Sequence, residues 1–213
     1  MKLVFPPLYA IIDPTLLTIS ELAMAEALAE SGVQLIQYRN KTAPSRQFFE
    51  ISRRLSIALA PRHVKLIVND RPDIALLSGA AGVHVGQDDF GVEDARKICG
   101  PDCWVGISTH NLEQLAAADL TSADYIAVGP IFPTATKKNP DPVVGTELLR
   151  KARKMTKKPL VAIGGITVER AAEVYRAGAD SLAVIRDLIC AANPGERARE
   201  YLDIAASSTG QAS

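Results

Sequence analysis

Two aspartates follow successive strand-like runs of the sequence and are placed to hold a divalent metal ion together. Asp70 comes directly after an apolar run that ends at Asn69, and Asp89 follows the next apolar run along the chain. If these runs are adjacent parallel strands, their carboxyl ends meet and bring the two carboxylates close. Mg²⁺ commonly binds one or two carboxylates together with phosphate oxygens and water. The alternative is that each aspartate caps a helix, one beginning near Pro72 and the other near Val92.

Basic side chains are expected on the same face as these carboxylates. Arg39 and Lys41 lie two residues apart at the end of another strand-like run, so they point the same way if the strand continues. Lys137 lies in a long segment, Pro130–Gly145, of the kind that often forms a lid or binding loop. These cations are suited to stabilising negative charge on a departing phosphate or diphosphate. The alternative for Arg39 and Lys41 is a solvated strand end, and the alternative for Pro130–Gly145 is a mobile surface loop.

The remaining polar groups favour charge stabilisation over proton abstraction. The three histidines form no triad with a serine or cysteine; His84 is expected in the barrel wall, and the role of His110 is left open. Gly164 and Gly165 follow another apolar run, where exposed backbone N–H groups can bind a phosphate. A tight turn is the alternative reading of the glycine pair.

Bulk composition excludes several classes of partner. The chain has 213 residues, of which 47% are hydrophobic and 23% charged, and its formal net charge is zero. Such a balance argues against an extended basic surface for nucleic acid or membranes. The three cysteines form no disulfide framework or zinc set, and no signal-like segment or apolar run of roughly 20 residues is present. We therefore expect a cytoplasmic protein with small-molecule partners; a homo-oligomer is left open.

Strand-like and helical segments alternate along the whole chain and must position these groups. Several of the apolar runs are almost continuously hydrophobic, as expected of parallel strands that are buried on both faces. The strand candidates are Leu8–Asp13, Val33–Arg39, Val64–Asn69, Gly82–Gly86, Trp104–Ser108, Tyr125–Gly129, Leu160–Ile163 and Ser181–Ile185. The helix candidates are Ser20–Ser31, Pro44–Ala60, Pro72–Leu77, Val92–Ile98, Leu112–Ala118, Thr146–Met155, Val168–Ala177 and Pro194–Ala206.

Eight such strand–helix units predict an α/β fold, a single (β/α)₈ TIM barrel over residues 1–213. Asn111, Thr167 and Asn193 are expected to cap three of the helices. Residues 207–213 are small and polar, and a disordered tail is expected there. A doubly wound sheet is the alternative, but no Gly-x-Gly-x-x-Gly turn follows the first strand.

Taken together, these residues resemble the thiamine-phosphate synthase family, also called thiamine monophosphate pyrophosphorylases. The resemblance covers nearly the whole chain and rests on five motifs that fall in order at successive strand ends. The motifs are Gln37-x-Arg39-x-Lys41, Asn69-Asp70-Arg71, Gly82-Val83-His84-Val85-Gly86-Gln87-x-Asp89, Gly129-Pro-Ile-Phe-Pro-Thr134-x-Thr136-Lys137 and Ala162-Ile-Gly-Gly-Ile166.

The resemblance implies a particular reaction. An enzyme of this family transfers the pyrimidine methyl group of 4-amino-2-methyl-5-hydroxymethylpyrimidine diphosphate to 4-methyl-5-(2-phosphoethyl)thiazole, which gives thiamine phosphate and diphosphate. In the family the diphosphate leaves first, and the thiazole nitrogen then attacks the pyrimidine carbocation. The resemblance implies one Mg²⁺ per subunit, held by Asp70 and Asp89.

The resemblance also assigns roles to particular side chains. Those implied to bind the pyrimidine diphosphate are Gln37, Tyr38, Arg39, Asn40, Lys41, Asn69, Ser108 and Lys137. The catalytic residues among them are Arg39, Lys41, Ser108 and Lys137. Those implied to bind the thiazole phosphate are Thr134, Ala135, Thr136, Gly165, Ile185 and Arg186.

Two positions depart from the family pattern, and two other functions compete with the synthase. The family usually has a small residue such as serine where this chain has Arg186, which would either add a charged contact or crowd the phosphate. Tyr38 replaces a commoner leucine. A thiazole tautomerase-like isomerase and a non-catalytic barrel that binds phosphorylated metabolites are the alternatives. The combination of Asp70, Asp89 and the basic side chains favours the synthase.

Overall fold

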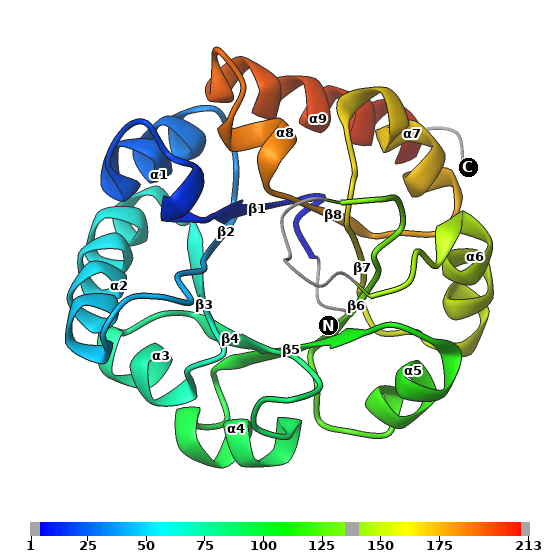
Figure 1. Ribbon diagram of the computed structural model, residues 1–213, viewed down its shortest axis with the longest axis horizontal. Coiled ribbons are helices and arrows are strands. Elements are labelled where there is room, and N and C mark those ends of the chain that lie inside the picture. The colour runs from blue at the N-terminus through cyan, green and yellow to red at the C-terminus, as the bar shows by residue number, and fades with distance from the viewer. Residues whose placement is uncertain (1–4, 135–140, 210–213) are drawn as a thin grey trace.

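Eight parallel strands close into a barrel, and helices surround it, as Figure 1 shows in a computed structural model. The structure describes residues 5–134 and 141–209. The strands are β1 (Leu8–Ile12), β2 (Leu35–Tyr38), β3 (Lys65–Asn69), β4 (Gly82–Val85), β5 (Trp104–Thr109), β6 (Tyr125–Val128), β7 (Leu160–Ile163) and β8 (Ser181–Val184). Each strand pairs in parallel with the next, and β8 pairs with β1, so the predicted (β/α)₈ barrel is confirmed.

The helices of the described residues fall close to the predicted positions. They are α1 (Glu21–Glu30), α2 (Ser45–Leu59), α3 (Pro72–Ser78), α4 (Val92–Cys99), α5 (Leu112–Asp119), α6 (Gly145–Met155), α7 (Val168–Arg176), α8 (Arg186–Ile189) and α9 (Pro194–Thr209). Two short 3₁₀ helices, η1 (Pro14–Leu16) and η2 (Ala60–Arg62), are also present. The sequence did not predict α8, η1 or η2, because three or four residues are too few to show helical periodicity. None of the described helices is long and apolar enough to cross a membrane.

Three helix ends test the capping predictions. The Asn111 side chain accepts a hydrogen bond from the backbone N–H of Gln114, and Asn193 accepts one from Glu196, so both caps are confirmed. Thr167 occupies the predicted N-cap position of α7, but its side chain makes no hydrogen bond to the helix backbone and instead interacts with Glu169.

The end of the chain differs from the predicted tail. Helix α9 continues to Thr209, three residues beyond the predicted boundary at Ala206. The Ser207 and Ser208 hydroxyls donate to the carbonyls of Asp203 and Ile204, four residues earlier, which satisfies these polar side chains within the helix. Residues 207–209 therefore belong to helix α9 in this structure, and residues 210–213 lie outside the described part of the chain.

Alternate residues of each strand enter two separate cores. On β1, Leu8, Ala10 and Ile12 pack against the helix layer, whereas Tyr9 and Ile11 point into the barrel. Apolar and aromatic side chains fill the barrel interior, as in other barrels of this size. Because adjacent residues face opposite ways, each strand end also delivers every second side chain to the mouth of the barrel.

Aromatic rings fill the amino-terminal half of the barrel. Phe5 precedes β1 and packs among the side chains that fill the barrel interior. Its ring stacks on Trp104 at a centroid distance of 5.6 Å and lies 4.8 Å from the ring of Tyr125. A Cβ atom at Gly106 would lie 2.0 Å from the Tyr125 ring, so glycine at this point of β5 makes room for that ring.

We expect Gly106→Ala to lower the free energy of unfolding by about 3 kcal/mol, since the added methyl group overlaps the Tyr125 ring. Urea denaturation followed by circular dichroism would measure the loss. Gly91→Ala is the matched control, because a Cβ atom there meets nothing closer than the Asp94 carboxylate at 4.0 Å. Equal stability of the Gly106 and Gly91 variants would contradict this account of the interior.

Candidate active site

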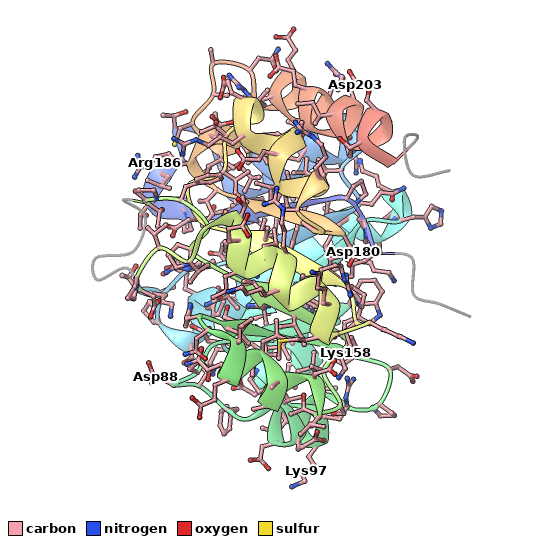
Figure 2. The ribbon with its side chains drawn as sticks, turned by 90° about the vertical axis from the view of Figure 1, so that its right-hand side faces the viewer. Asp88, Lys97, Lys158, Asp180, Arg186 and Asp203 are labelled. Carbon is pink, nitrogen blue, oxygen red and sulfur yellow. The ribbon has the colours of Figure 1, made fainter. Side chains whose placement is uncertain are left out.

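A cavity of about 670 Å³ opens at the carboxyl ends of the strands. Figure 2 shows Asp88 and Arg186 at this end of the molecule and Asp180 toward the opposite end. Most of the predicted site residues that the structure describes line this cavity. They are Gln37, Arg39, Lys41, Asn69, Asp70, Asp89, Ser108, Thr134, Gly165, Ile185 and Arg186. Closure of the barrel therefore brings together residues that lie as far apart as β2 and the end of β8.

The placement of Asp70 and Asp89 disagrees with a simple capping role. Helix α3 has Arg71 at its N-cap and α4 has Gly91, so neither aspartate occupies the cap position. Asp70 adopts the left-handed region with φ of 63°, and its backbone N–H donates to the His84 carbonyl at 2.8 Å. A non-glycine residue in this region is uncommon and costs conformational energy. The tightly held turn directs the Asp70 carboxylate into the cavity.

The two carboxylates share one patch of the cavity wall. Burial raises the pKa of Asp89, and the neighbouring Asp70 carboxylate raises it further. The Gly86 backbone N–H, which donates to Asp89 Oδ2 at 2.8 Å, and the Lys41 charge act in the opposite direction. Lys41 Nζ lies 3.0 Å from Asp70 Oδ2. The pair thus has a mutual repulsion that a cation between the carboxylates would relieve.

This donor set fits Mg²⁺ better than a softer metal. Two carboxylates supply hard oxygen ligands, and substrate oxygens and water commonly complete the coordination of Mg²⁺. Within residues 5–134 and 141–209, no group of three or more His, Cys, Asp or Glu side chains is arranged to bind a metal. Asp70 and Asp89 are the two carboxylates of the cavity wall that could hold such an ion.

Arg39 is positioned by an aspartate that the sequence interpretation left without a role. Asp13, at the end of β1, is buried, and its Oδ2 accepts a hydrogen bond from Arg39 Nη1 at 2.5 Å. The other oxygen of Asp13 accepts from the backbone and hydroxyl of Thr15 at the start of η1. The sequence did offer a signal for this role, since Asp13 is a charged residue at the end of the first apolar run. Asp13 fixes the direction of the guanidinium at the cavity wall.

The structure corrects the placement of Tyr38 and Asn40. Strand alternation turns Tyr38 away from the cavity and into the helix layer, where its ring lies 5.1 Å from that of Phe48. Asn40 Oδ1 accepts hydrogen bonds from the backbone of Thr42 and Ala43 and thereby shapes the turn before α2. Neither residue lines the cavity, so their predicted substrate contacts do not follow from the positions of their side chains.

Ser108 has a buried histidine as its partner. His84 Nε2 lies 2.9 Å from Ser108 Oγ, and Nδ1 lies 3.0 Å from the hydroxyl of Tyr125. Burial lowers the pKa of His84 to about 4, although the charge of Asp89 acts in the opposite direction. His84 is therefore neutral near pH 7, in agreement with its predicted place in the barrel wall.

The turn after β7 approaches the segment after β6 closely. The backbone N–H groups of Ile131 and Phe132 donate to the carbonyls of Ile163 and Gly164 at 2.9 and 3.0 Å. A Cβ atom at Gly165 would lie 2.4 Å from the Pro133 carbonyl oxygen, so only glycine permits this approach. The contact carries Thr134 to the cavity wall. The predicted residues Ala135, Thr136 and Lys137 lie outside the described residues.

Other cavity residues were missed or left open by the sequence interpretation. His110 Nδ1 lies 2.6 Å from the Gly129 carbonyl, and its Nε2 lies 3.5 Å from Asp141 Oδ2. Arg170 lies over the Phe132 ring at 4.5 Å and donates to the Gly165 carbonyl. Arg170 lies on a helix with regular amphipathic spacing, so the sequence offered no signal that it reaches the cavity.

The fold and this cavity define a (β/α)₈-barrel enzyme with a charged site at the carboxyl ends of its strands. Comparison with known proteins makes the assignment narrower. The family model described as thiamine monophosphate synthase matches residues 8–188. The chain is 52% identical to the thiamine-phosphate synthase of Koribacter versatilis over 206 residues, which cover 93% of this chain and 95% of that protein.

Further relatives agree. The thiamine-phosphate synthase of Shouchella clausii is 44% identical over 168 residues, 79% of this chain and 80% of that protein. The solved structure of thiamine phosphate pyrophosphorylase from Pyrococcus furiosus superposes with a TM-score of 0.87 at 34% identity, covering 95% of this chain and 96% of that one. The chain therefore belongs to the thiamine monophosphate synthase family. It is an enzyme of the transferase class.

The depressed pKa of His84 predicts a specific loss of stability in acid. The unfolded chain binds a proton on this histidine near pH 6.5, whereas the folded protein does so only near pH 4. The unfolded state thus gains protons first as the pH falls through this window, and the free energy of unfolding should decrease by about 3 kcal/mol.

Urea denaturation of the parent and His84→Gln at pH 7 and pH 4 would isolate this effect, because the variant lacks the titrating group. We expect a smaller decrease for the variant. His63→Gln, which replaces an exposed histidine, is the control and should retain the parent's decrease. If the parent and His84→Gln lost equal stability over this range, His84 would not be the group responsible.

Proposed function

We propose that this enzyme joins 4-amino-2-methyl-5-hydroxymethylpyrimidine diphosphate to 4-methyl-5-(2-phosphoethyl)thiazole and releases thiamine phosphate and diphosphate. The observation that carries the proposal is the pairing of Asp70 with Asp89 beside Lys41 at the cavity wall. A diphosphate with its metal ion needs both signs of charge in this arrangement. The family membership and the names of the relatives support the same reaction.

The residues of the pyrimidine end would act mainly on the leaving group. The bond between the pyrimidine methylene carbon and the diphosphate oxygen breaks, and the oxygen keeps the electron pair. Arg39 and Lys41 would stabilise the negative charge that develops there. Mg²⁺ held by Asp70 and Asp89 would supply further neutralisation of the diphosphate. Gln37, Asn69 and Ser108, which line the same cavity, would orient the ring.

The second substrate would bind on the opposite side of the cavity. The backbone around Thr134 and Gly165 lies beside the end of β8, where Ile185 and Arg186 line the cavity. Amide N–H groups and the Arg186 cation are suited to a phosphate. The thiazole nitrogen then forms a bond to the methylene carbon with its own lone pair. Neither step as written requires a proton transfer.

We expect product formation to depend on a divalent ion and on its carboxylate pair. Purified protein with both substrates and Mg²⁺ should form thiamine phosphate and diphosphate, whereas excess chelator should abolish both. Asp89→Asn should lower turnover on the order of a hundredfold, since a charged group that stabilises the leaving group is impaired. Mg²⁺ together with diphosphate should raise the Tm of the parent more than that of the variant.

The control for this prediction is Asp203→Asn, an exposed aspartate on α9 that Figure 2 shows far from the mouth of the cavity. It should behave as the parent does. Full turnover in the presence of chelator would overturn the proposed metal site. Tight substrate binding with no diphosphate release under any condition would instead support a binding protein, and rearrangement of the thiazole alone would support an isomerase.

Lys137→Ala is expected to slow turnover on the order of a hundredfold or more, because the change removes a cation implied to contact the diphosphate. Steady-state release of diphosphate and a thermal melt would separate a catalytic defect from a loss of folding. Lys97→Ala removes an exposed lysine from α4, at the lower edge of the molecule in Figure 2, and should retain full activity. Near-normal turnover of Lys137→Ala would remove this lysine from the mechanism.

A further inference from the structure

A line of hydrogen-bonded side chains crosses the barrel interior between two walls of the cavity. Gln37 Nε2 donates to the Tyr9 hydroxyl at 2.7 Å, and the Tyr9 and Tyr125 hydroxyls lie 3.0 Å apart. Tyr125 and His84 Nδ1 are also 3.0 Å apart, and His84 Nε2 reaches Ser108 Oγ at 2.9 Å. The two ends of this line, Gln37 and Ser108, are residues of the proposed pyrimidine site, whereas its middle members are not.

The barrel holds the middle of this line in place. Strand register sets His84 beside Gly106 and Gly106 beside Tyr125. The space above Gly106 admits the Tyr125 ring, which then stacks on the His84 ring at a centroid distance of 5.5 Å. Tyr9, Tyr125 and His84 are all buried, and their polar atoms bond to one another and, at the two ends, to the cavity residues Gln37 and Ser108.

The available protons determine the direction of these bonds. Among the described residues, the Tyr9 hydroxyl has only Gln37 and Tyr125 as partners, and Gln37 is already a donor to it. Tyr9 must then donate to Tyr125, because its own proton would otherwise be buried without an acceptor. Tyr125 in turn donates to His84 Nδ1, its remaining partner.

The last steps fix the state of the histidine and the serine. Because His84 Nδ1 accepts a hydrogen bond from Tyr125, the His84 ring carries no proton on that nitrogen. With Nδ1 acting as an acceptor, the single ring proton lies on Nε2 and is donated to Ser108 Oγ. The proton of Ser108 is then left to point into the cavity that this residue lines.

We propose that Tyr9, Tyr125 and His84 form a positioning relay that holds His84 as the Nε2–H tautomer and makes Ser108 a hydrogen-bond donor to the pyrimidine substrate. The same relay occupies one N–H of Gln37 and so fixes the rotation of its amide. A ring with an acceptor nitrogen facing Ser108 is accepted, and a ring that presents a donor there is rejected. The identity of the substrate rests on the proposed function; the tautomer does not.

Nitrogen NMR of protein labelled with ¹⁵N-histidine tests the tautomer directly. The two ring nitrogens of a neutral histidine differ widely in chemical shift according to which one carries the proton, and His84→Gln identifies the His84 signals. At pH 7 we expect a proton on Nε2 and none on Nδ1. In Tyr125→Phe the Nδ1 partner is lost, and the single tautomer should give way to a mixture.

Tyr175→Phe is the matched control, because it also removes one phenol hydroxyl, which donates to the Pro7 carbonyl outside the relay. It should leave the His84 signals unchanged. A proton on Nδ1 in the parent would overturn the proposal, since every bond of the relay would then run the opposite way. Unchanged His84 signals in Tyr125→Phe would also overturn it.

Kinetics provide the second readout. Tyr125→Phe should lower kcat/KM for the pyrimidine diphosphate about tenfold, as expected from disturbing one buried hydrogen bond, and leave the KM of the thiazole phosphate unchanged. A general loss of packing would change both substrates alike and would contradict the relay. If the parent protein formed no thiamine phosphate, the proposed function would fail, while the NMR result would still decide the tautomer.

Discussion

Closure of eight parallel strands is the constraint on which the site depends. In a closed barrel each strand presents alternate side chains to the interior, and all carboxyl ends lie at one mouth. The arrangement brings Gln37 and Arg39 into the cavity and sends Tyr38, between them, into the helix layer. Barrel closure therefore makes neighbours of residues that lie far apart in the sequence, and no contiguous sequence motif is required.

Charge is balanced locally at this mouth rather than over the whole surface. Arg39 is paired with the buried Asp13, and Lys41 with Asp70, so the cations are held in place before any ligand arrives. The left-handed backbone at Asp70 and the repulsion between Asp70 and Asp89 both raise the free energy of the folded state. The packing of the barrel around them keeps these groups in place. Such preorganisation lowers the reorganisation required when an anionic substrate binds.

The sequence predicted the strands, the main helices and part of the cavity wall, because buried parallel strands are hydrophobic throughout and their ends carry unusual polar residues. It could not predict the internal partners of those residues. The contact between Tyr9 and Tyr125 joins positions 116 residues apart and depends on barrel closure. Nor could the sequence indicate that the side chains of Tyr38 and Asn40 lie outside the cavity lining, because motif membership does not say which way a side chain points. Helix α8 has four residues, too few to show the helical periodicity of apolar side chains.

The aromatic filling below the cavity affects how ligands can enter and leave. In the described part of the chain, Phe5, Trp104 and Tyr125 pack together across the amino-terminal half of the barrel, at the end opposite the mouth of the cavity. A ligand bound to Gln37 and Ser108 would be covered by a second ligand that binds nearer the mouth of the cavity. If both proposed substrates enter through this mouth, the one that contacts Gln37 and Ser108 would have to bind before the one nearer the rim.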